Sequence, residues 1–479
     1  MKKVLIVGAG VSGLATGYHL SRFGEQRGTP LRVKILESSS RPGGRVWTER
    51  VNGFQVEAGA SSFLDTKRST LNLCGELKLQ DKLIAANPAA RDRFIFWNDR
   101  LHKLPTGVGE LMRSGILSWR GKLRLIAESI IPRRRDGHDE SIHEFACRRI
   151  GREAAGVLVD AMVTGIQAGD PTLLSVAAAF PRMIELEREF GSLIRAMPKV
   201  RRQRLAESTA AAHHSPLTTH HSTTPGGTLW SLKGGMGQLI GSLADSCGET
   251  GAEIIRGITV KRIVRRADGG WTVHAERTDE WPADAVVLAC PSFVQAEIVE
   301  SLDGELSRLL LEIKYNSVAV VALGFRQADL ASPISGFGYL SPQRTRRDVL
   351  GVLWSSSIFD HRSPAGMVLV QAMCGGWNRP EIVSWNDEQL VGTVLAELHQ
   401  TMAITAKPAL VHVIRWPQAI PQYHLGHLDR VTAIEARRKK HVGLYLTGNS
   451  FRGVSVNDCT AEAVRCANEI IQNLTTSMS

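Results

Sequence analysis

The opening of the chain constrains its fold more than any other stretch. Residues 4–7 are apolar, and Gly8, Gly10 and Gly13 follow with the spacing G-x-G-x-x-G, directly before a helical pattern. This order predicts a buried strand and then a tight turn at Gly8. It also predicts that the backbone approaches a pyrophosphate at Gly10 and that a helix packs closely on the strand at Gly13. The opening is therefore typical of a Rossmann-like dinucleotide site.

A second predicted strand supports this interpretation. It covers residues 31–36 and ends at Glu37, where a carboxylate would accept a hydrogen bond from an adenosine ribose; we include the neighbouring Ser38 in the site. Two alternatives remain open: an ordinary βα unit without a ligand, and a signal peptide in which Met1, Lys2 and Lys3 precede an uncharged run to Leu20. The glycines dilute the apolar run, and a signal peptide would leave Glu37 unexplained.

A second glycine-rich stretch indicates which dinucleotide binds. Residues 41–48 read R-P-G-G-R-V-W-T, in which Gly43 and Gly44 would bring backbone amides to a cofactor and Arg45 would add a cation for phosphate. This stretch, placed after a Rossmann acid, resembles the FAD-dependent family that includes amine oxidases, phytoene desaturases and protoporphyrinogen oxidases. We therefore expect FAD as the cofactor. A surface turn with incidental arginines is the alternative.

Further flavin contacts are expected in three other parts of the chain. A glycine-rich turn after a short strand would run beneath the isoalloxazine ring, and the resemblance puts a later residue near the adenine. The turn before the C-terminal helix would direct amides at the flavin edge. The residues concerned are Gly59 and Ala60, then Val260, then Gly448, Gly453, Val454 and Val456. A plain turn and a plain terminal helix are the alternatives.

Length and composition indicate a multidomain globular protein. A chain of 479 residues, 43% hydrophobic and 22% charged, is expected to form two or three domains. Its net charge of +11 comes with no nucleic-acid motif, so no nucleic-acid partner is expected. The seven cysteines are scattered, which predicts reduced thiols and a cytoplasmic location. No metal site is expected, although His213, His214, His220 and His221 occur in a Ser/Thr-rich stretch that we interpret as a flexible insertion.

The order of the predicted elements gives an α/β fold class. We predict a discontinuous Rossmann-like FAD-binding domain, a substrate lobe with a mixed or antiparallel sheet, and an inserted helical domain. The FAD-binding domain would comprise residues 1–85, 226–295 and 436–479; the substrate lobe 86–108 and 296–435; the helical domain 109–197; and the insertion 198–225.

The helical segment mixes basic and apolar residues. Seven cations (Arg113, Arg120, Lys122, Arg124 and Arg133 to Arg135) alternate with leucines, isoleucines and Trp119. Such a surface suits anionic lipid headgroups, so peripheral membrane contact is one expectation. A solvated helical face explains the pattern equally well.

Motifs in the middle of the chain resemble oxygen-dependent protoporphyrinogen oxidases. They are R-F-x-x-W from Arg93, Q-A-G-D-P from Gln167, S-L-K-G-G from Ser231, G-F-G from Gly336, W-S-S-S from Trp354 and W-P…I-P-Q-Y from Trp416. The resemblance covers nearly the whole chain except residues 199–224. It implies a porphyrinogen substrate, oxygen as acceptor and hydrogen peroxide as product, with the oligomeric state, monomer or homodimer, left open.

The same resemblance implies roles for three residues. Arg93 would bind a propionate, the carbonyl of Gly169 would line the cavity, and Phe337 would pack on the macrocycle. No side chain is assigned as a catalytic acid or base, since the flavin N5 would accept the hydride. An arginine that only solubilises an edge strand is the alternative for Arg93.

Three other functions remain open at this point. Coproporphyrinogen III oxidases of the same family share nearly every motif. A flavin amine oxidase typically needs an aromatic cage, for which the turn before Gly453 offers only Phe451. A basic surface-binding protein that retains a Rossmann lobe would have no enzymatic activity.

Overall fold

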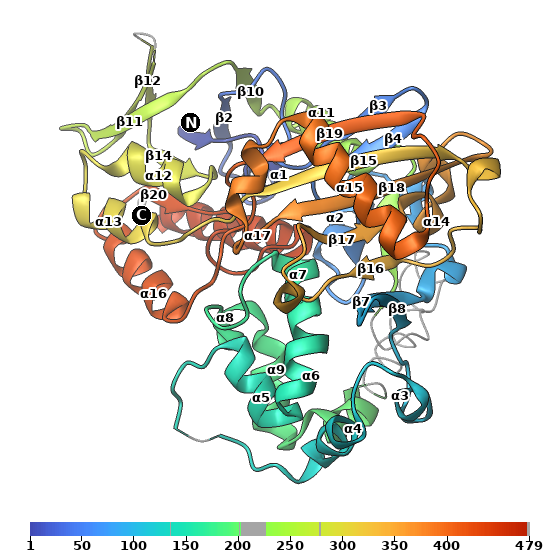
Figure 1. Ribbon diagram of the computed structural model, residues 1–479. Helices are drawn as coiled ribbons and strands as arrows, with labels where there is room; N and C mark the ends of the chain where they lie inside the picture. The colour runs from blue at the N-terminus through green and yellow to red at the C-terminus, as the bar shows by residue number, and fades with distance from the viewer. Residues whose placement is uncertain (135, 201, 203–226, 277–278, 477–479) are drawn as a thin grey trace.

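A parallel sheet organises the part of the molecule that contains the opening strand. The computed structural model describes residues 1–134, 136–200, 202, 227–276 and 279–476 (Figure 1). The sheet has the order β10-β2-β1-β14-β20, and all four neighbouring pairs are parallel. The strands are β1 (Lys2–Val7), β2 (Leu31–Glu37), β10 (Glu253–Arg256), β14 (Ala285–Leu288) and β20 (Leu444–Leu446). Three separate parts of the chain therefore build one sheet.

Three helices cover one face of this sheet. Helix α1 (Val11–Gln26) packs against both α11 (Met236–Glu249) and α17 (Val456–Thr476). Leu14, Leu239 and Ile470 are fully buried in the shared core, because each of these helices presents an apolar stripe to the strands. In Figure 1, α1 and α17 lie close together although they come from opposite ends of the chain.

The other face carries a small antiparallel sheet and three helices. The sheet order is β11-β12-β13, and Trp271 is fully buried between it and the parallel sheet. The elements are β11 (Val260–Arg265), β12 (Trp271–Ala275), β13 (Glu280–Ala283), α12 (Ser292–Val299), α13 (Gly304–Leu311) and α16 (His427–Arg438).

The second large sheet has seven strands. Its order is β19-β15-β18-β17-β16-β7-β8, with every pair antiparallel except β16 and β7. Helix α15 (Asp387–Met402) covers one face, where Leu390 and Leu398 are buried. The strands are β7 (Arg93–Trp97), β8 (Arg100–Lys103), β15 (Val318–Arg326), β16 (Gly338–Leu340), β17 (Val349–Leu353), β18 (Met367–Gly375) and β19 (Leu410–Trp416). Because β7 lies between β16 and β8, the edge-strand interpretation of Arg93 is wrong.

Short elements connect the two large sheets. They form a hairpin and a three-stranded sheet of order β5-β9-β6. The elements are β3 (Thr48–Val51), β4 (Phe54–Glu57), β5 (Phe63–Leu64), α2 (Ser69–Glu76), β6 (Leu83–Ala85), β9 (Leu229–Leu232) and α14 (Ser355–Ile358). A buried ion pair between Glu57 and Arg362, 3.3 Å apart, ties this region to the seven-stranded sheet.

A group of helices lies below the sheets in Figure 1, in blue-green to green. Its core contains a buried ion pair between Arg149 and Glu128, both 0% exposed, and Glu187 pairs with the same arginine. In the described part of the chain, no helix combines the length and apolar character that a membrane span requires. The helices are α3 (Val108–Arg113), α4 (Trp119–Ile126), α5 (Ile142–Ile150), α6 (Arg152–Ala154), α7 (Asp160–Gln167), α8 (Val176–Ala179) and α9 (Pro181–Phe190).

The fold confirms the predicted α/β class with parallel and antiparallel sheets, and it differs from the sequence expectation in detail. Residues 280–288 form two strands instead of one, because the chain is interrupted at Asp284, whose carboxylate accepts a 2.7 Å hydrogen bond from the Lys3 amide, and β13 and β14 belong to different sheets. Helix α16 was not predicted. The predicted domain limits stay predictions, and His213, His214, His220 and His221 lie outside the described residues.

Candidate active site

The first glycine loop is shaped by contacts that only glycine allows. Gly8 has a φ of +103°, and a Cβ on Gly13 would lie 1.9 Å from the Gly8 carbonyl oxygen. The Gly8 amide donates a 2.8 Å hydrogen bond to the carbonyl of Leu36, which joins the turn to β2. A Cβ on Gly10, in contrast, would meet nothing within 4 Å. The space in front of Gly10 is therefore open, as a pyrophosphate requires.

The second glycine loop lies against the first. Gly43 donates a 2.8 Å hydrogen bond to the carbonyl of Ala9, and Gly10 and Gly43 form an isolated parallel bridge. Gly43 and Gly44 have φ angles of +115° and +56°, which favour glycine. The two loops thus form one wall of a single site.

The carboxylate of Glu37 is buried at the end of β2. One oxygen accepts a 2.7 Å hydrogen bond from the Ala9 amide, and the other accepts hydrogen bonds from the Ser39 amide at 2.8 Å and the Ser38 hydroxyl at 3.4 Å. A carboxylate has lone pairs for about four hydrogen bonds, so one acceptor position remains for a ribose hydroxyl. The carbonyl of Glu37 also binds the Ile258 amide at 2.9 Å, which brings the start of β11, with the buried Val260, to this end.

Several side chains retain accessible surface although protein surrounds them. Burial raises the pKa of Cys290 to about 12 and of Cys459 to about 11, yet both are only partly buried by surface area. Burial also lowers the pKa of Arg45, which is likewise partly accessible. Protein therefore surrounds these three side chains, which stay partly accessible. Within the described ranges no carboxylate pairs with Arg45, so its charge is available for an anion such as a cofactor phosphate.

A chain of contacts joins the remaining cofactor residues to Arg45. A Cβ on Gly59 would lie 2.1 Å from the Arg45 carbonyl oxygen, so these two backbones touch, and Ala60 packs against the core that contains α1. The Arg45 guanidinium lies 5.4 Å from the Tyr315 ring centroid, and the Tyr315 hydroxyl is 2.7 Å from that of Ser450. The predicted cofactor residues therefore converge from both ends of the chain.

The turn before α17 is held by Tyr423, a residue for which the sequence predicted no role. Gly448 and Gly453 have φ angles of +125° and +114°. Tyr423 accepts a 2.9 Å hydrogen bond from the Gly453 amide and donates one of 2.5 Å to the Asn449 carbonyl. Val454 follows, partly exposed, and α17 starts at Val456. The signal for Tyr423 was its place in the Ile-Pro-Gln-Tyr motif.

Two of the three predicted substrate residues lie together. Arg93 begins β7, Phe337 directly precedes β16, and the guanidinium carbon of Arg93 is 4.6 Å from the Phe337 ring centroid. Burial lowers the pKa of Arg93 although this residue is exposed overall. No ion pair involves Arg93 in the part of the chain that the structure describes.

Gly169, the third predicted substrate residue, lies away from β7 and β16 in the sequence and follows α7. It is buried, and its carbonyl oxygen accepts a hydrogen bond from the side chain of Gln343. A Cβ there would lie 2.2 Å from the Gln422 side-chain oxygen. The structure therefore explains why this position is glycine, whereas a contact between its carbonyl and substrate stays a prediction.

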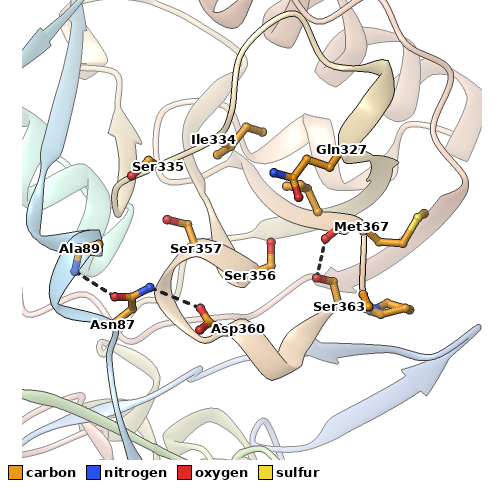
Figure 2. A pocket seen from close by; sticks show the side chains of 14 residues that line it. Asn87, Ala89, Gln327, Ile334, Ser335, Ser356, Ser357, Asp360, Ser363 and Met367 are labelled. Carbon is orange, nitrogen blue, oxygen red and sulfur yellow. Dashed lines mark hydrogen bonds between the residues drawn. The ribbon is translucent and has the colours of Figure 1, made fainter.

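A polar pocket of ≈ 330 Å³ lies behind the turn that carries Phe337, and Figure 2 shows its lining. Three of its serine hydroxyls form hydrogen bonds with the protein backbone. Ser357 accepts a 3.0 Å hydrogen bond from the Gly336 amide, Ser356 accepts one from Leu369, and Ser363 donates to Met367. The hydrogen bond from Gly336 to Ser357 therefore stabilises the turn that carries Phe337. Elsewhere, among the residues described, no group of three His, Cys, Asp or Glu side chains is arranged to hold a metal ion.

The fold and the site define a flavoenzyme. The family of flavin containing amine oxidoreductases matches residues 11–471, and the chain belongs to this family. It is an FAD-dependent oxidoreductase, and the geometry of the glycine loops fits a dinucleotide cofactor.

Individual relatives narrow the comparison. The chain is 31% identical to human protoporphyrinogen oxidase, with 98% of each chain covered, and 28% identical to coproporphyrinogen III oxidase of Bacillus subtilis, with 96% of this chain and 95% of that protein covered. A solved structure from Exiguobacterium sp. 255-15, provisionally named protoporphyrinogen oxidase, has a TM-score of 0.82 at 25% identity, with 99% of both chains covered. A putrescine oxidase variant at 16% identity and a TM-score of 0.69 shares the fold.

Proposed function

We propose that this enzyme oxidises protoporphyrinogen IX to protoporphyrin IX, with molecular oxygen as the final acceptor and hydrogen peroxide as the product. The observation that carries the proposal is the contact between Arg93 and Phe337. A cation without a carboxylate partner, placed over an aromatic ring beside a flavin domain, suits a substrate that joins a carboxylate to a broad apolar ring. The names of the human and tobacco relatives, the latter 30% identical, support the same substrate.

The proposed oxidation requires no side chain to act as an acid or a base. A porphyrinogen carries methylene bridges between pyrroles, so loss of a hydride leaves a delocalised cation. Bound FAD supplies the hydride acceptor at N5. Arg93 would hold a propionate, Phe337 would pack on the macrocycle, and together they would orient one bridge. Three oxidations remove six electrons and six hydrogen atoms in total, which three oxygen molecules take up as three hydrogen peroxide molecules.

Coproporphyrinogen III is the second candidate substrate, and the relative from Bacillus subtilis favours it. It differs in carrying four carboxylates instead of two. A fluorescence assay of the FAD-loaded enzyme with oxygen, run in parallel on both porphyrinogens, separates the candidates. Faster formation of protoporphyrin supports the main proposal, and a strong preference for coproporphyrinogen replaces the substrate but keeps the reaction. Formation of no porphyrin by the FAD-loaded enzyme would refute both.

We further propose that the enzyme is cytoplasmic and contacts the membrane peripherally through α4. Trp119, Leu123 and Ile130 are 61%, 51% and 75% exposed along one side of α4 and the turn after it. Lys122 is buried and donates to the Met112 carbonyl, so this surface is more apolar than the sequence pattern indicated. Substitution of Trp119 and Leu123 by serine should reduce sedimentation with anionic vesicles, whereas Val442→Ser, at an exposed valine elsewhere, should not.

A further inference from the structure

A second cavity lies between the helices and the seven-stranded sheet. It has a volume of ≈ 600 Å³, and its lining includes Arg152, Asp160, Ser341, Arg344 and Arg346. Cavities of roughly 300–1,000 Å³ are typical of small-molecule sites. The cavity is therefore large enough for an organic ligand.

This cavity is distinct from the Arg93 site. Arg93 begins β7 and Trp97 ends it, so the two residues are about 13 Å apart along the strand. The Arg344 guanidinium lies 5.1 Å from the Trp97 ring centroid, and Ser341 follows the last residue of β16. Because β7 and β16 run parallel, the Arg93–Phe337 contact lies at one end of the pair and the cavity at the other.

The cavity carries uncompensated positive charge. Two of its arginines are neutralised, since Arg347 pairs with Glu397 and Arg379 pairs with Asp348 and Glu381. The other three (Arg152, Arg344 and Arg346) form no ion pair in the described part of the chain.

The two carboxyl groups in the lining offset this charge only in part. Burial raises the pKa of Asp160, whereas a 3.2 Å hydrogen bond from the Arg344 amide to its Oδ2 acts in the opposite direction; even with both carboxyl groups charged, the three unpaired arginines of the described lining outnumber them. One oxygen of the Asp170 carboxylate accepts hydrogen bonds from the Thr172 amide at 2.8 Å and the Thr172 hydroxyl at 2.6 Å. The lining therefore attracts anions.

Two buried polar atoms in the lining lack hydrogen-bond partners. They are Oδ1 of Asp160, in a residue 6% exposed, and Oγ of Ser341, in a residue 2% exposed. Buried polar atoms are nearly always paired, and an unpaired one destabilises the fold. A ligand oxygen would accept a hydrogen bond from Ser341 and, when Asp160 is protonated, from that carboxyl group as well.

We propose that this cavity binds a small organic polyanion whose carboxylate or phosphate oxygens contact Arg152, Arg344 and Arg346 and accept a hydrogen bond from Ser341. Arginine suits such groups because its fork of donors matches two oxygens of one carboxylate or phosphate. The proposal does not depend on the porphyrinogen assignment.

Calorimetric titration of the FAD-loaded protein at constant ionic strength tests the proposal. The probes are citrate, which carries clustered carboxylates, and inorganic phosphate, and their relative affinities distinguish the two kinds of anionic group. We expect saturable binding of at least one probe with one site per chain. The double variant Arg344→Gln/Arg346→Gln should weaken that binding at least tenfold. The matched control, Arg32→Gln/Arg326→Gln, removes two exposed arginines outside the cavity and should bind as the wild type does.

Two single variants make the test specific. Ser341→Ala should weaken binding severalfold without lowering thermal stability, because its hydroxyl has no partner to lose in the free protein. Arg93→Ala should leave citrate and phosphate binding unchanged. The proposal is overturned if neither probe binds to the wild type, if the control pair weakens binding as much as the cavity pair, or if Arg93→Ala abolishes it.

Discussion

The hydroxyl of Tyr423 holds the amide of Gly453 in a 2.9 Å hydrogen bond and donates to Asn449 on the other side of the same turn. The ring of His427 stacks on Tyr423, with centroids 4.0 Å apart, and fixes the hydroxyl in place. The turn before α17 is therefore shaped by Tyr423, which is separated from it in the sequence by α16 and β20.

Replacement of Tyr423 by phenylalanine should weaken FAD binding. Loss of both hydrogen bonds should also reduce the free energy of unfolding by about 1–3 kcal/mol. FAD affinity can be measured by flavin fluorescence and stability by denaturation. Tyr445→Phe is the matched control, since the Tyr445 hydroxyl binds Asn473 at 3.0 Å in the helical core and its loss should spare FAD affinity. Equal FAD affinity in both variants would show that the hydrogen bonds of Tyr423 do not contribute to FAD binding.

Gly10 and Gly13 should respond differently to alanine. Gly10→Ala places a Cβ in open space at an ordinary φ of −73°, so the protein should fold but bind FAD at least tenfold more weakly. Gly13→Ala drives a Cβ into the Gly8 backbone and should disrupt folding. Gly241→Ala, in α11 with nothing within 4 Å, is the control and should slightly stabilise the fold. Wild-type FAD affinity in Gly10→Ala would contradict the pyrophosphate assignment.

Arg93→Ala should raise the apparent KM for the porphyrinogen by about tenfold to a hundredfold, because a charge-assisted contact contributes roughly 1.5–3 kcal/mol. The Arg93→Lys variant should recover part of this affinity. Arg100→Ala, at an exposed arginine on the neighbouring strand, should leave KM unchanged. Steady-state kinetics measures all three, and an unaltered KM in Arg93→Ala would exclude the propionate contact.

Glu128→Gln should destabilise the helical region by about 3–5 kcal/mol, because it removes the nearer of the two carboxylates that pair with the buried Arg149 guanidinium. Glu185→Gln breaks an exposed pair with Arg182, in which both side chains are 49% exposed, and should change stability by less than about 1 kcal/mol. Urea denaturation followed by circular dichroism compares the two variants. Similar losses of unfolding free energy in the two variants would show that the buried pair contributes no more to stability than the exposed pair.

The protein should lose stability between pH 6.5 and 4. Burial lowers the pKa of both His19 and His427 from 6.5 to about 4. As the pH falls through 6.5, His19 and His427 become protonated in the unfolded chain but stay neutral in the folded protein. Unfolding therefore becomes more favourable. At pH 5 each histidine should account for about 2 kcal/mol. Unfolding free energies at pH 7.5 and 5 measure this loss, and His19→Phe should remove about half of it.

Local features of the site could be predicted from the sequence, because each depends on neighbouring residues. The turn at Gly8, the open space at Gly10 and the close packing at Gly13 follow from strand, turn and helix in succession. The acid at the end of β2 was predictable for the same reason.

Contacts between distant parts of the chain were not predictable in this way. Tyr423 meets Gly453, and Arg45 meets Tyr315, only because separate sheets pack together. The burial of Lys122 could not be predicted, because the periodicity of apolar residues in the sequence does not show which face of the helix packs against a neighbouring element. The unpaired charge of the second cavity likewise depends on which arginines find carboxylates in three dimensions.

The parallel sheet takes its outer strand, β20, from residues 444–446, and α17 then packs on α1. During synthesis, the glycine loops at Gly8 and Gly43 emerge from the ribosome hundreds of residues before the turn at Gly453. A nascent chain can therefore complete the loop predicted to bind pyrophosphate early, whereas the turn predicted to meet the isoalloxazine ring is added only when translation is nearly complete. We therefore expect FAD to bind only after the C-terminal helix has been made, so that premature termination before the turn at Gly453 should yield a colourless protein.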